Sequence, residues 1–197
     1  DRYVWSEAAS QMKKWREKFG VTMPVSVNVS RVDLSDPDMT NYICKIINEN
    51  GISSADYYLE VTESAYTENS QQIIEIVKNL RNKGFKIEMD DFGSGYSSLN
   101  MLTTLPIDAL KLDKGFINNI ESGNKEMKMI ELILGIAEFL NVPVIAEGVE
   151  TKEQLELLKL AKCDVIQGYY FSKPLSADDF DALIQKDIEV RKDISNS

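Results

Sequence analysis

The stretch YYLEVTESAYTENSQQIIEIVKNLRNKGFKIEMDD (residues 57–91) decides the fold class. Its first six residues are rich in β-branched and aromatic side chains and predict a strand, and its last six, 86–91, predict another. Between them Ile73, Val77 and Leu80 recur at helical spacing. A strand, a helix and a second strand form a βαβ unit, whose strands run parallel with a right-handed crossover.

The same alternation extends in both directions from this unit. Further strands are predicted at 25–30, 109–113, 143–148 and 164–171. Further helices are predicted from the N-terminus to Gly20, from Asp36-Pro37 to Gly51, around 98–105, from Ile130 to Leu140, after a capping box of Thr151 and Gln154, and after Ser176. Six such units fit either an open doubly wound sheet or a (β/α)8 barrel. A complete barrel takes about 250 residues, so we expect a barrel without its opening strands.

The composition limits the chemistry. The 197 residues include 22 Lys+Arg, 32 Asp+Glu and no histidine. This excludes Ser-His-Asp and Cys-His nucleophile pairs, HExxH zinc sites and histidine-metal phosphohydrolases. The two cysteines, Cys44 and Cys163, lie far apart and predict free thiols in a reducing cytoplasm. A pI near 4.6 argues against DNA or RNA as a partner.

No segment predicts insertion into a membrane. The longest apolar run, IELILGIAEFL, is interrupted by two glutamates, and a spanning helix needs about 18 apolar residues. The chain opens without the apolar core of a signal peptide. We expect one partial barrel domain over 1–197 in the cytoplasm, with a frayed tail at 187–197; a longer parent protein could be membrane-anchored.

Every predicted strand carries a polar side chain near its C-terminal end. In chain order these are Asn28, Glu60, Asp90 with Asp91, Lys111, Glu147 and Gln167. One such residue could be a helix cap or a solvated loop residue, but six of six predict a shared site. The C-terminal ends of parallel strands meet at the mouth of a barrel or at the binding edge of an open sheet.

The carboxylates at this mouth predict a site for divalent cations. Several carboxylates brought together repel one another in a partly dry site. Ligands that are all oxygen select Mg²⁺ or Mn²⁺. The adjacent Asp90 and Asp91 suit a pair of metal ions, which would clamp a phosphoester and activate water without a histidine. Lys111 could orient that water or neutralise charge in the transition state.

Two short motifs resemble those of other enzymes and are rejected. Asp91-Phe92-Gly93 spells the kinase DFG, but the chain has no Gly-rich ATP loop and no histidine for an HRD segment. Gly93-Ser94-Gly95 lacks the third glycine of a dinucleotide loop. We interpret these glycines as allowing a loop to bend close to the metal ions.

Taken together, the motifs resemble the EAL domain of bacterial cyclic di-GMP phosphodiesterases. The matching strings are SVNVS, LEVTES, DDFGSGYSSL, KLDKGFI, VIAEGVET and QGYYFSKPL, in this order. The resemblance implies a TIM-like (β/α)8 barrel with one antiparallel strand, of which about six βα units are present here. It also implies hydrolysis of cyclic di-GMP to linear pGpG with Mg²⁺ or Mn²⁺.

The resemblance implies roles for the metal ligands. Asn28 and Glu60 resemble ligands of one metal ion, and Asp90 resembles the ligand that bridges both. Asp91 and Glu147 resemble contributors to the second metal site.

The resemblance also implies supporting roles. Lys111 is similar to the residue that holds the attacking water, and Gln167 to its support. Glu63 is similar to the glutamate that steadies the loop after Asp91, a loop tied in the family to metal binding and dimerisation. That loop includes Phe92, Gly93, Ser94 and Gly95. A homodimer and an upstream sensor or GGDEF-type domain are therefore expected.

The chain departs from the family at its front. The Glu-Ala-Leu segment that names the family, whose glutamate is a metal ligand, would lie before residue 1 with the opening strands and a substrate-contacting arginine. We expect a fragment of an active parent protein, itself impaired or inactive. Two alternatives stay open: a receptor or scaffold that binds cyclic di-GMP without cleaving it, and an unrelated Schiff-base aldolase using Lys111.

Overall fold

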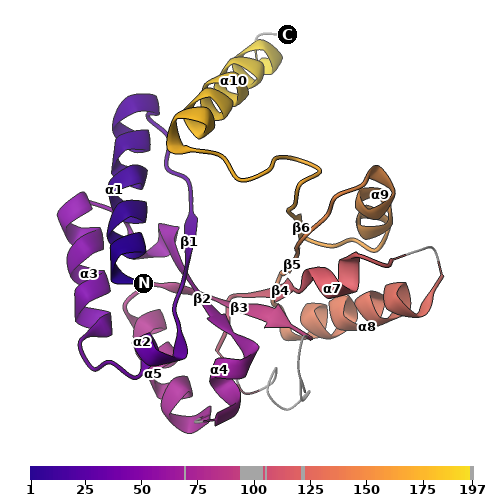
Figure 1. The fold of residues 1–197 in the computed structure, drawn as a ribbon, viewed down its shortest axis with the longest axis horizontal. Coiled ribbons are helices and arrows are strands. Elements are labelled where there is room, and N and C mark those ends of the chain that lie inside the picture. Colours follow the sequence, from indigo (N-terminus) through magenta and orange to yellow (C-terminus); the bar gives the residue numbers. More distant parts are fainter. Residues whose placement is uncertain (69, 94–103, 105, 121–122, 196–197) are drawn as a thin grey trace.

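The computed structural model describes residues 1–68, 70–93, 104, 106–120 and 123–195. Their strands form one parallel sheet in the order β1-β2-β3-β4-β5-β6. The strands are β1 Val25–Asn28, β2 Tyr57–Thr62, β3 Lys86–Phe92, β4 Ala109–Leu112, β5 Val144–Ala146 and β6 Val165–Ile166. A doubly wound sheet reverses its strand order partway across. The unbroken sequential order is that of a barrel wall, and this sheet curls as part of one (Figure 1).

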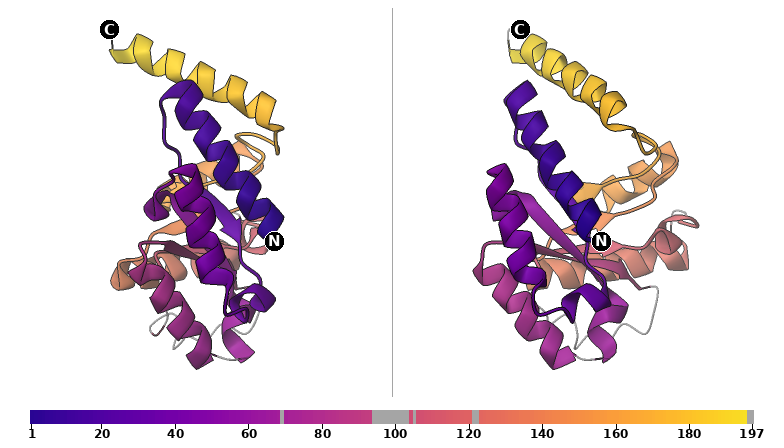
Figure 2. Two further views of the ribbon diagram at one scale, coloured as in Figure 1. Left: turned by 90° about the vertical axis from the view of Figure 1, so that its left-hand side faces the viewer. Right: turned by 60° about the vertical axis from the view of Figure 1, so that its left-hand side comes forward.

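Helices pack around the curled sheet, except for the last one, which projects away from it (Figure 1). They are α1 Arg2–Phe19, α2 Arg31–Leu34, α3 Met39–Asn50, the 3-10 turn η1 Ser54–Asp56, α4 Glu63–Glu68, α5 Ser70–Asn82, α7 Lys114–Ile117, α8 Lys125–Leu140, α9 Lys152–Leu160 and α10 Ala177–Ser195. Helices α1 and α3 pack side by side, and α10 extends past the end of α1 (Figure 2). None of the described helices combines the length and apolar character that crossing a lipid bilayer requires.

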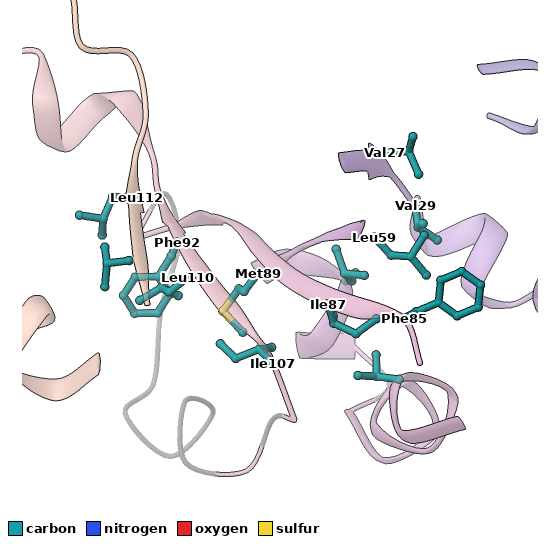
Figure 3. Packing of buried hydrophobic residues seen from close by; sticks show 14 of the residues in the cluster. Val27, Val29, Leu59, Phe85, Ile87, Met89, Phe92, Ile107, Leu110 and Leu112 are labelled. Atoms are coloured by element: carbon teal, nitrogen blue, oxygen red, sulfur yellow. The ribbon is translucent and has the colours of Figure 1, made fainter. Parts of the chain in front are cut away.

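Strand β2 shows how the sequence separates the two faces of the sheet. Tyr57, Leu59 and Val61 are buried, and the residues between them are partly exposed. Because side chains alternate along a strand, the buried set packs under the helices and the other set faces the hollow of the sheet. Figure 3 shows the helix-side layer continuing across neighbouring strands. That layer includes Val27, Leu59, Ile87, Met89, Leu110 and Leu112.

Several element boundaries follow directly from capping residues. Helix α1 ends as predicted at Gly20, whose φ of 68° is a left-handed conformation that glycine adopts at little steric cost. Thr151 and Gln154 form the predicted capping box of α9. The Ser176 hydroxyl accepts a hydrogen bond from the Asp179 amide at 3.2 Å and caps α10 as predicted.

The predicted start of α3 is wrong by a few residues. The helix begins at Met39, with Asp38 before it, instead of at the Asp36-Pro37 pair. The Asp36 carboxylate is engaged elsewhere, because it accepts the amide of Asp38 and pairs with Arg2 at 2.5 Å. Asp36 therefore caps the turn that precedes α3.

The last strand is shorter than the predicted range 164–171. After β6 the Tyr170 amide bonds to the Val149 carbonyl, so the chain turns across the neighbouring loop instead of continuing the ladder. The helix predicted around 98–105 lies almost entirely outside the described residues. Helix α10 continues into the predicted tail, 187–197, and fraying stays a prediction because helical geometry does not measure opening.

Candidate active site

The polar residues predicted from the strand ends lie along one edge of the sheet, and Lys111 lies at their centre. Its ammonium nitrogen is 2.5 Å from Glu60 Oε1, 2.7 Å from Glu147 Oε1 and 3.4 Å from Asp90 Oδ1. The whole lysine is only 4% exposed. Strands β2, β3 and β4 and the residue after β5 thus bring three carboxylates onto one buried cation.

The pKa values at this cluster reflect competition between burial and charge. Burial alone would lower the pKa of Lys111, but the hydrogen bonds and charges of Glu147 and Glu60 outweigh it and raise the pKa above its ordinary value. Burial also raises the pKa of both glutamates, and the Lys111 ammonium opposes that rise. The cluster therefore holds more negative charge than one lysine neutralises, and it favours additional positive charge.

Gln167, which directly follows β6, extends the cluster towards the last strand of the sheet. Its side-chain amide donates a hydrogen bond to Glu147 Oε1 at 2.7 Å, the same oxygen that faces Lys111. Glu147 directly follows β5, and its amide donates a hydrogen bond to the Leu112 carbonyl at 3.3 Å. The two donors therefore fix the direction in which this carboxylate points.

Asp90 and Asp91 diverge at the end of β3. The register of β3 with β4 shifts between Met89 and Phe92, and Asp91 has a φ of 56°. A positive φ is uncommon for a residue with a side chain. The Asp91 amide donates a hydrogen bond to Asp90 Oδ1 at 2.9 Å, and this bond orients the Asp90 side chain. Asp90 reaches Lys111, whereas Asp91 lines a separate hollow at the mouth.

That hollow, of about 610 Å³, lies beside the lysine cluster. Its acidic lining comes from Asp91, Asp113, Glu147 and Glu150, and its basic lining from Lys114 and Lys173. Burial raises the pKa of Asp91, and the charges of Asp90 and Asp113 add to the rise. The mouth therefore offers oxygen ligands and cationic groups next to one another.

Glu63 fixes the start of the loop after β3. The residue is 3% exposed, and its Oε2 accepts a hydrogen bond from the Gly93 amide at 2.9 Å. Gly93 has a φ of 92°, and a Cβ there would lie 2.0 Å from Phe116 Cε2. Only glycine fits this turn. Of the predicted loop residues, Phe92 is the last residue of β3 and Gly93 forms this turn. Ser94 and Gly95 lie outside the described residues.

Helix α1 positions the end of β1. The buried Trp5 indole donates a hydrogen bond to the Asn28 carbonyl at 2.8 Å, and the Tyr57 hydroxyl donates to the Trp5 carbonyl at 2.9 Å. These bonds connect α1, β1 and β2. They hold Asn28 beside Glu60, its partner in the β1–β2 register.

Two acidic residues of this region, Asp113 and Glu88, were not among the site residues predicted from the sequence. Asp113 directly follows β4 and lines the hollow with Asp91, a position that the strand-end rule could have identified. Glu88 is 3% exposed and lies two residues before Asp90, on the same face of β3. The period of two along a strand was the signal for it.

The donor chemistry fits the divalent cations predicted from the sequence. Asn28, Glu60, Asp90, Asp91 and Glu147 offer only oxygen, which suits Mg²⁺ and Mn²⁺. Within the described ranges, no three acidic or cysteine side chains form a metal centre as they stand. Three of the carboxylates point instead to the Lys111 ammonium. The metal-ligand roles of these residues stay predictions.

Comparison with known proteins places this geometry in context. The model of the EAL domain matches residues 1–174. Cyclic di-GMP phosphodiesterase NbdA of Pseudomonas aeruginosa is 39% identical over 89% of this chain and 22% of its own length. The chain spans less than a third of the length of the curated relatives it matches.

Solved structures agree with the fold. The MucR phosphodiesterase in complex with cyclic di-GMP superposes with a TM-score of 0.85 at 31% identity, over 91% of this chain and 72% of that one. The manganese and cyclic di-GMP complex of Klebsiella pneumoniae BlrP1 gives a TM-score of 0.81 at 27% identity, over 88% of this chain and 44% of that one. The predicted incomplete TIM-like barrel is thereby confirmed.

Proposed function

This chain belongs to the EAL domain family, and we propose that its parent protein uses it to hydrolyse one phosphodiester of cyclic di-GMP, giving linear pGpG, with the help of divalent cations. The observation that carries the proposal is the convergence of Glu60, Asp90 and Glu147 on buried Lys111 at the C-terminal ends of the strands. A phosphodiester needs cationic groups around its oxygens, and this mouth has a lysine and an excess of carboxylate with which to hold more cations.

Residues of this chain would hold the metal ions. We assign Asn28, Glu60 and Asp90 to one ion, and Asp90, Asp91 and Glu147 to a second. Bound there, the ions would neutralise charge on the phosphodiester and lower the pKa of a water molecule. Klebsiella pneumoniae BlrP1 has been solved in cyclic di-GMP complexes with calcium and with manganese. Either Mg²⁺ or Mn²⁺ suits the donor set of this chain.

The protein's own groups would orient the reaction. The Lys111 ammonium can donate a hydrogen bond to the attacking water and hold it in line with the phosphorus. Gln167 keeps Glu147 facing the same point, through their 2.7 Å hydrogen bond. Glu63 keeps the backbone after Asp91 in one conformation. The adjoining hollow can receive part of the nucleotide, with Lys114 and Lys173 near its phosphates.

Chromatography of cyclic di-GMP incubated with the parent protein, which includes this chain, tests the proposal. With Mg²⁺ or Mn²⁺ we expect conversion to pGpG, and with EDTA we expect none. Lys111→Gln should remove the conversion. Cyclic di-GMP that stays intact in every metal would contradict the proposal.

A cyclic di-GMP receptor is the second candidate. It is favoured by the ion pairs themselves, because Lys111 already engages the carboxylates that catalysis would need. This reading predicts saturable binding of cyclic di-GMP in both EDTA and Mn²⁺, without turnover. Equilibrium dialysis with intact nucleotide recovered on both sides would support it.

The wider setting of the chain also belongs to the proposal. We infer a homodimer that involves the loop after Asp91, a cytoplasmic location, and a sensor or GGDEF-type domain in the parent protein. The relative MucR of Pseudomonas aeruginosa is a bifunctional diguanylate cyclase and cyclic di-GMP phosphodiesterase, which supports the last point. Light scattering of the purified protein tests the dimer, since a monomer mass would contradict it.

A further inference from the structure

Glu88 is a buried carboxylate that the proposed reaction does not use. It lies on β3 and is 3% exposed. Its register partners are Glu60 on β2 and Ala109 on β4, and Asp90 follows two residues later on the same face. A carboxylate is rarely buried to this extent without a partner that stabilises its charge.

The contact between Lys111 and Glu60 crosses directly over the strand that carries Glu88. Lys111 belongs to β4 and Glu60 to β2, and β3 lies between these strands (Figure 1). The 2.5 Å ion pair therefore spans β3 on the face where Glu88 and Asp90 project. Ala109, two residues before Lys111, is small enough to leave space beside Glu88.

The charges around Glu88 come from every neighbouring strand. Lys111 attracts it, and Glu60, Asp90 and Glu147 repel it. The Ser26 side chain on β1 donates a hydrogen bond to it. Burial raises the pKa of Glu88, and the Lys111 ammonium on the adjacent strand opposes that rise.

The carboxylates that contact Lys111 share one property. Glu60, Asp90 and Glu147 are all assigned above to metal ions. A carboxylate that ligates a divalent cation has less negative charge to offer a neighbouring ammonium, and a buried ammonium without counter-charge is strongly unfavourable. Glu88 is a buried carboxylate near Lys111 that has no such assignment.

We propose that Glu88 is a positioning residue for Lys111, and that it supplies the counter-charge which keeps the ammonium extended over β3 when the other three carboxylates bind metal ions. This inference rests on the proposed function. It assigns Glu88 no contact with substrate or metal. Its action is through Lys111 alone.

Glu88→Gln tests the proposal, because glutamine keeps the volume and an acceptor for Ser26 but removes the charge. Urea unfolding is measured in EDTA and in saturating Mn²⁺. In EDTA, where three other carboxylates pair with Lys111, we expect no loss of stability. In Mn²⁺ we expect a clear loss, equivalent to about tenfold weaker Mn²⁺ binding. Glu131→Gln, which removes an exposed charge from α8, is the matched control. It should leave the stability unchanged both in EDTA and in Mn²⁺.

A role confined to the Ser26 hydrogen bond predicts the same loss in EDTA and in Mn²⁺, and that result would overturn the proposal. Direct attraction between Glu88 and the metal ions predicts that the Mn²⁺ effect persists in a Lys111→Met background. Action through Lys111 predicts that most of it disappears there. Persistence at full size would also overturn the proposal.

Two further measurements keep the test independent of folding and of the proposed function. If Lys111→Met does not fold, the ¹⁵N ammonium signal of Lys111 in the Mg²⁺-loaded protein should be visible in wild type and lost by solvent exchange in Glu88→Gln. An unchanged signal contradicts the inference. In turnover, Glu88→Gln should lower kcat about tenfold with little change in KM. Absence of turnover in wild type contradicts the proposed function instead, and the unfolding experiment still decides the role of Glu88.

Discussion

Glu63 Oε2 accepts the Gly93 amide at 2.9 Å and so ties the first turn of α4 to the loop that follows β3. The bond joins two segments 30 residues apart in the chain, and the glutamate that makes it is almost fully buried. The backbone just after Asp91 is therefore fixed from a neighbouring element, because its own strand ends at Phe92.

We expect Glu63→Ala to lower the turnover of cyclic di-GMP more than Glu63→Gln. Alanine removes the acceptor of a charge-assisted hydrogen bond, a change of about 2 kcal/mol, and this corresponds to more than a tenfold loss if the loop geometry is needed in the transition state. Glutamine retains a carbonyl oxygen. Initial rates at saturating Mn²⁺ check this ranking, and wild-type rates for the alanine variant would contradict it.

Gly93→Ala should destabilise the protein more than Gly20→Ala. Both glycines have positive φ, 92° and 68°, so both substitutions carry the backbone cost of about 1 kcal/mol. At Gly93 the new methyl would also lie 2.0 Å from Phe116, whereas at Gly20 nothing lies within 4 Å. Urea unfolding of the two variants gives the comparison, and equal losses would show that the contact with Phe116 relaxes freely.

The positions and types of the main elements were predictable because they depend on local periodicity and on caps. The buried set of β2 and the glycine at the end of α1 are both readable one element at a time. The turn after β6 was not predictable, since it depends on the Val149 carbonyl in another loop. For the same reason the bond between Trp5 and Asn28 had no local signal.

The site was predictable as a set of strand ends but not as a set of contacts. Parallel strands necessarily bring Glu60, Lys111 and Glu147 to one edge. That Lys111 pairs with both glutamates depends on side-chain directions across three strands, which periodicity alone does not specify. Asp91 was expected beside Asp90, yet the register shift in β3 directs it into the adjoining hollow.

The stabilisation by Mn²⁺ should grow with pH. Burial raises the pKa of Glu60 and Glu147 above 4.5, so without metal the folded protein binds more protons than the unfolded chain. The contribution of these groups to stability is then greatest below pH 4.5 and is lost as pH rises through the raised values. Metal binding needs the deprotonated forms. Thermal unfolding with and without Mn²⁺ should show a larger shift at about pH 7.5 than at about pH 5, and a pH-independent shift would contradict this.

Asp108→Asn should destabilise the protein without affecting metal binding. The Asp108 carboxylate accepts two hydrogen bonds of 3.0 Å from Arg81 and one of 3.0 Å from the Ile87 amide, which ties α5 to the start of β3 and to the segment before β4. Burial would raise the pKa of Asp108, but these partners outweigh it and lower the pKa. We expect a loss of about 2 kcal/mol in unfolding free energy.

The pH dependence provides the check on Asp108. Because its folded pKa lies below the ordinary 3.8, its contribution is present above that pH and is lost as the pH falls through the folded value. The difference between wild type and Asp108→Asn should therefore shrink in acid. A difference that stays constant down to about pH 3 would show that the charge has no part in it.

Counting the Mn²⁺ ions bound to the protein tests the central claim most directly. Titration followed by electron paramagnetic resonance should show two bound ions per chain in wild type, with the signal of a close, coupled pair. Asp90→Asn should lose the coupled signal, because Asp90 is assigned as the bridging ligand, while Glu131→Asn should retain it. Absence of saturable Mn²⁺ binding in wild type would contradict the claim that this mouth is a two-metal phosphodiesterase site.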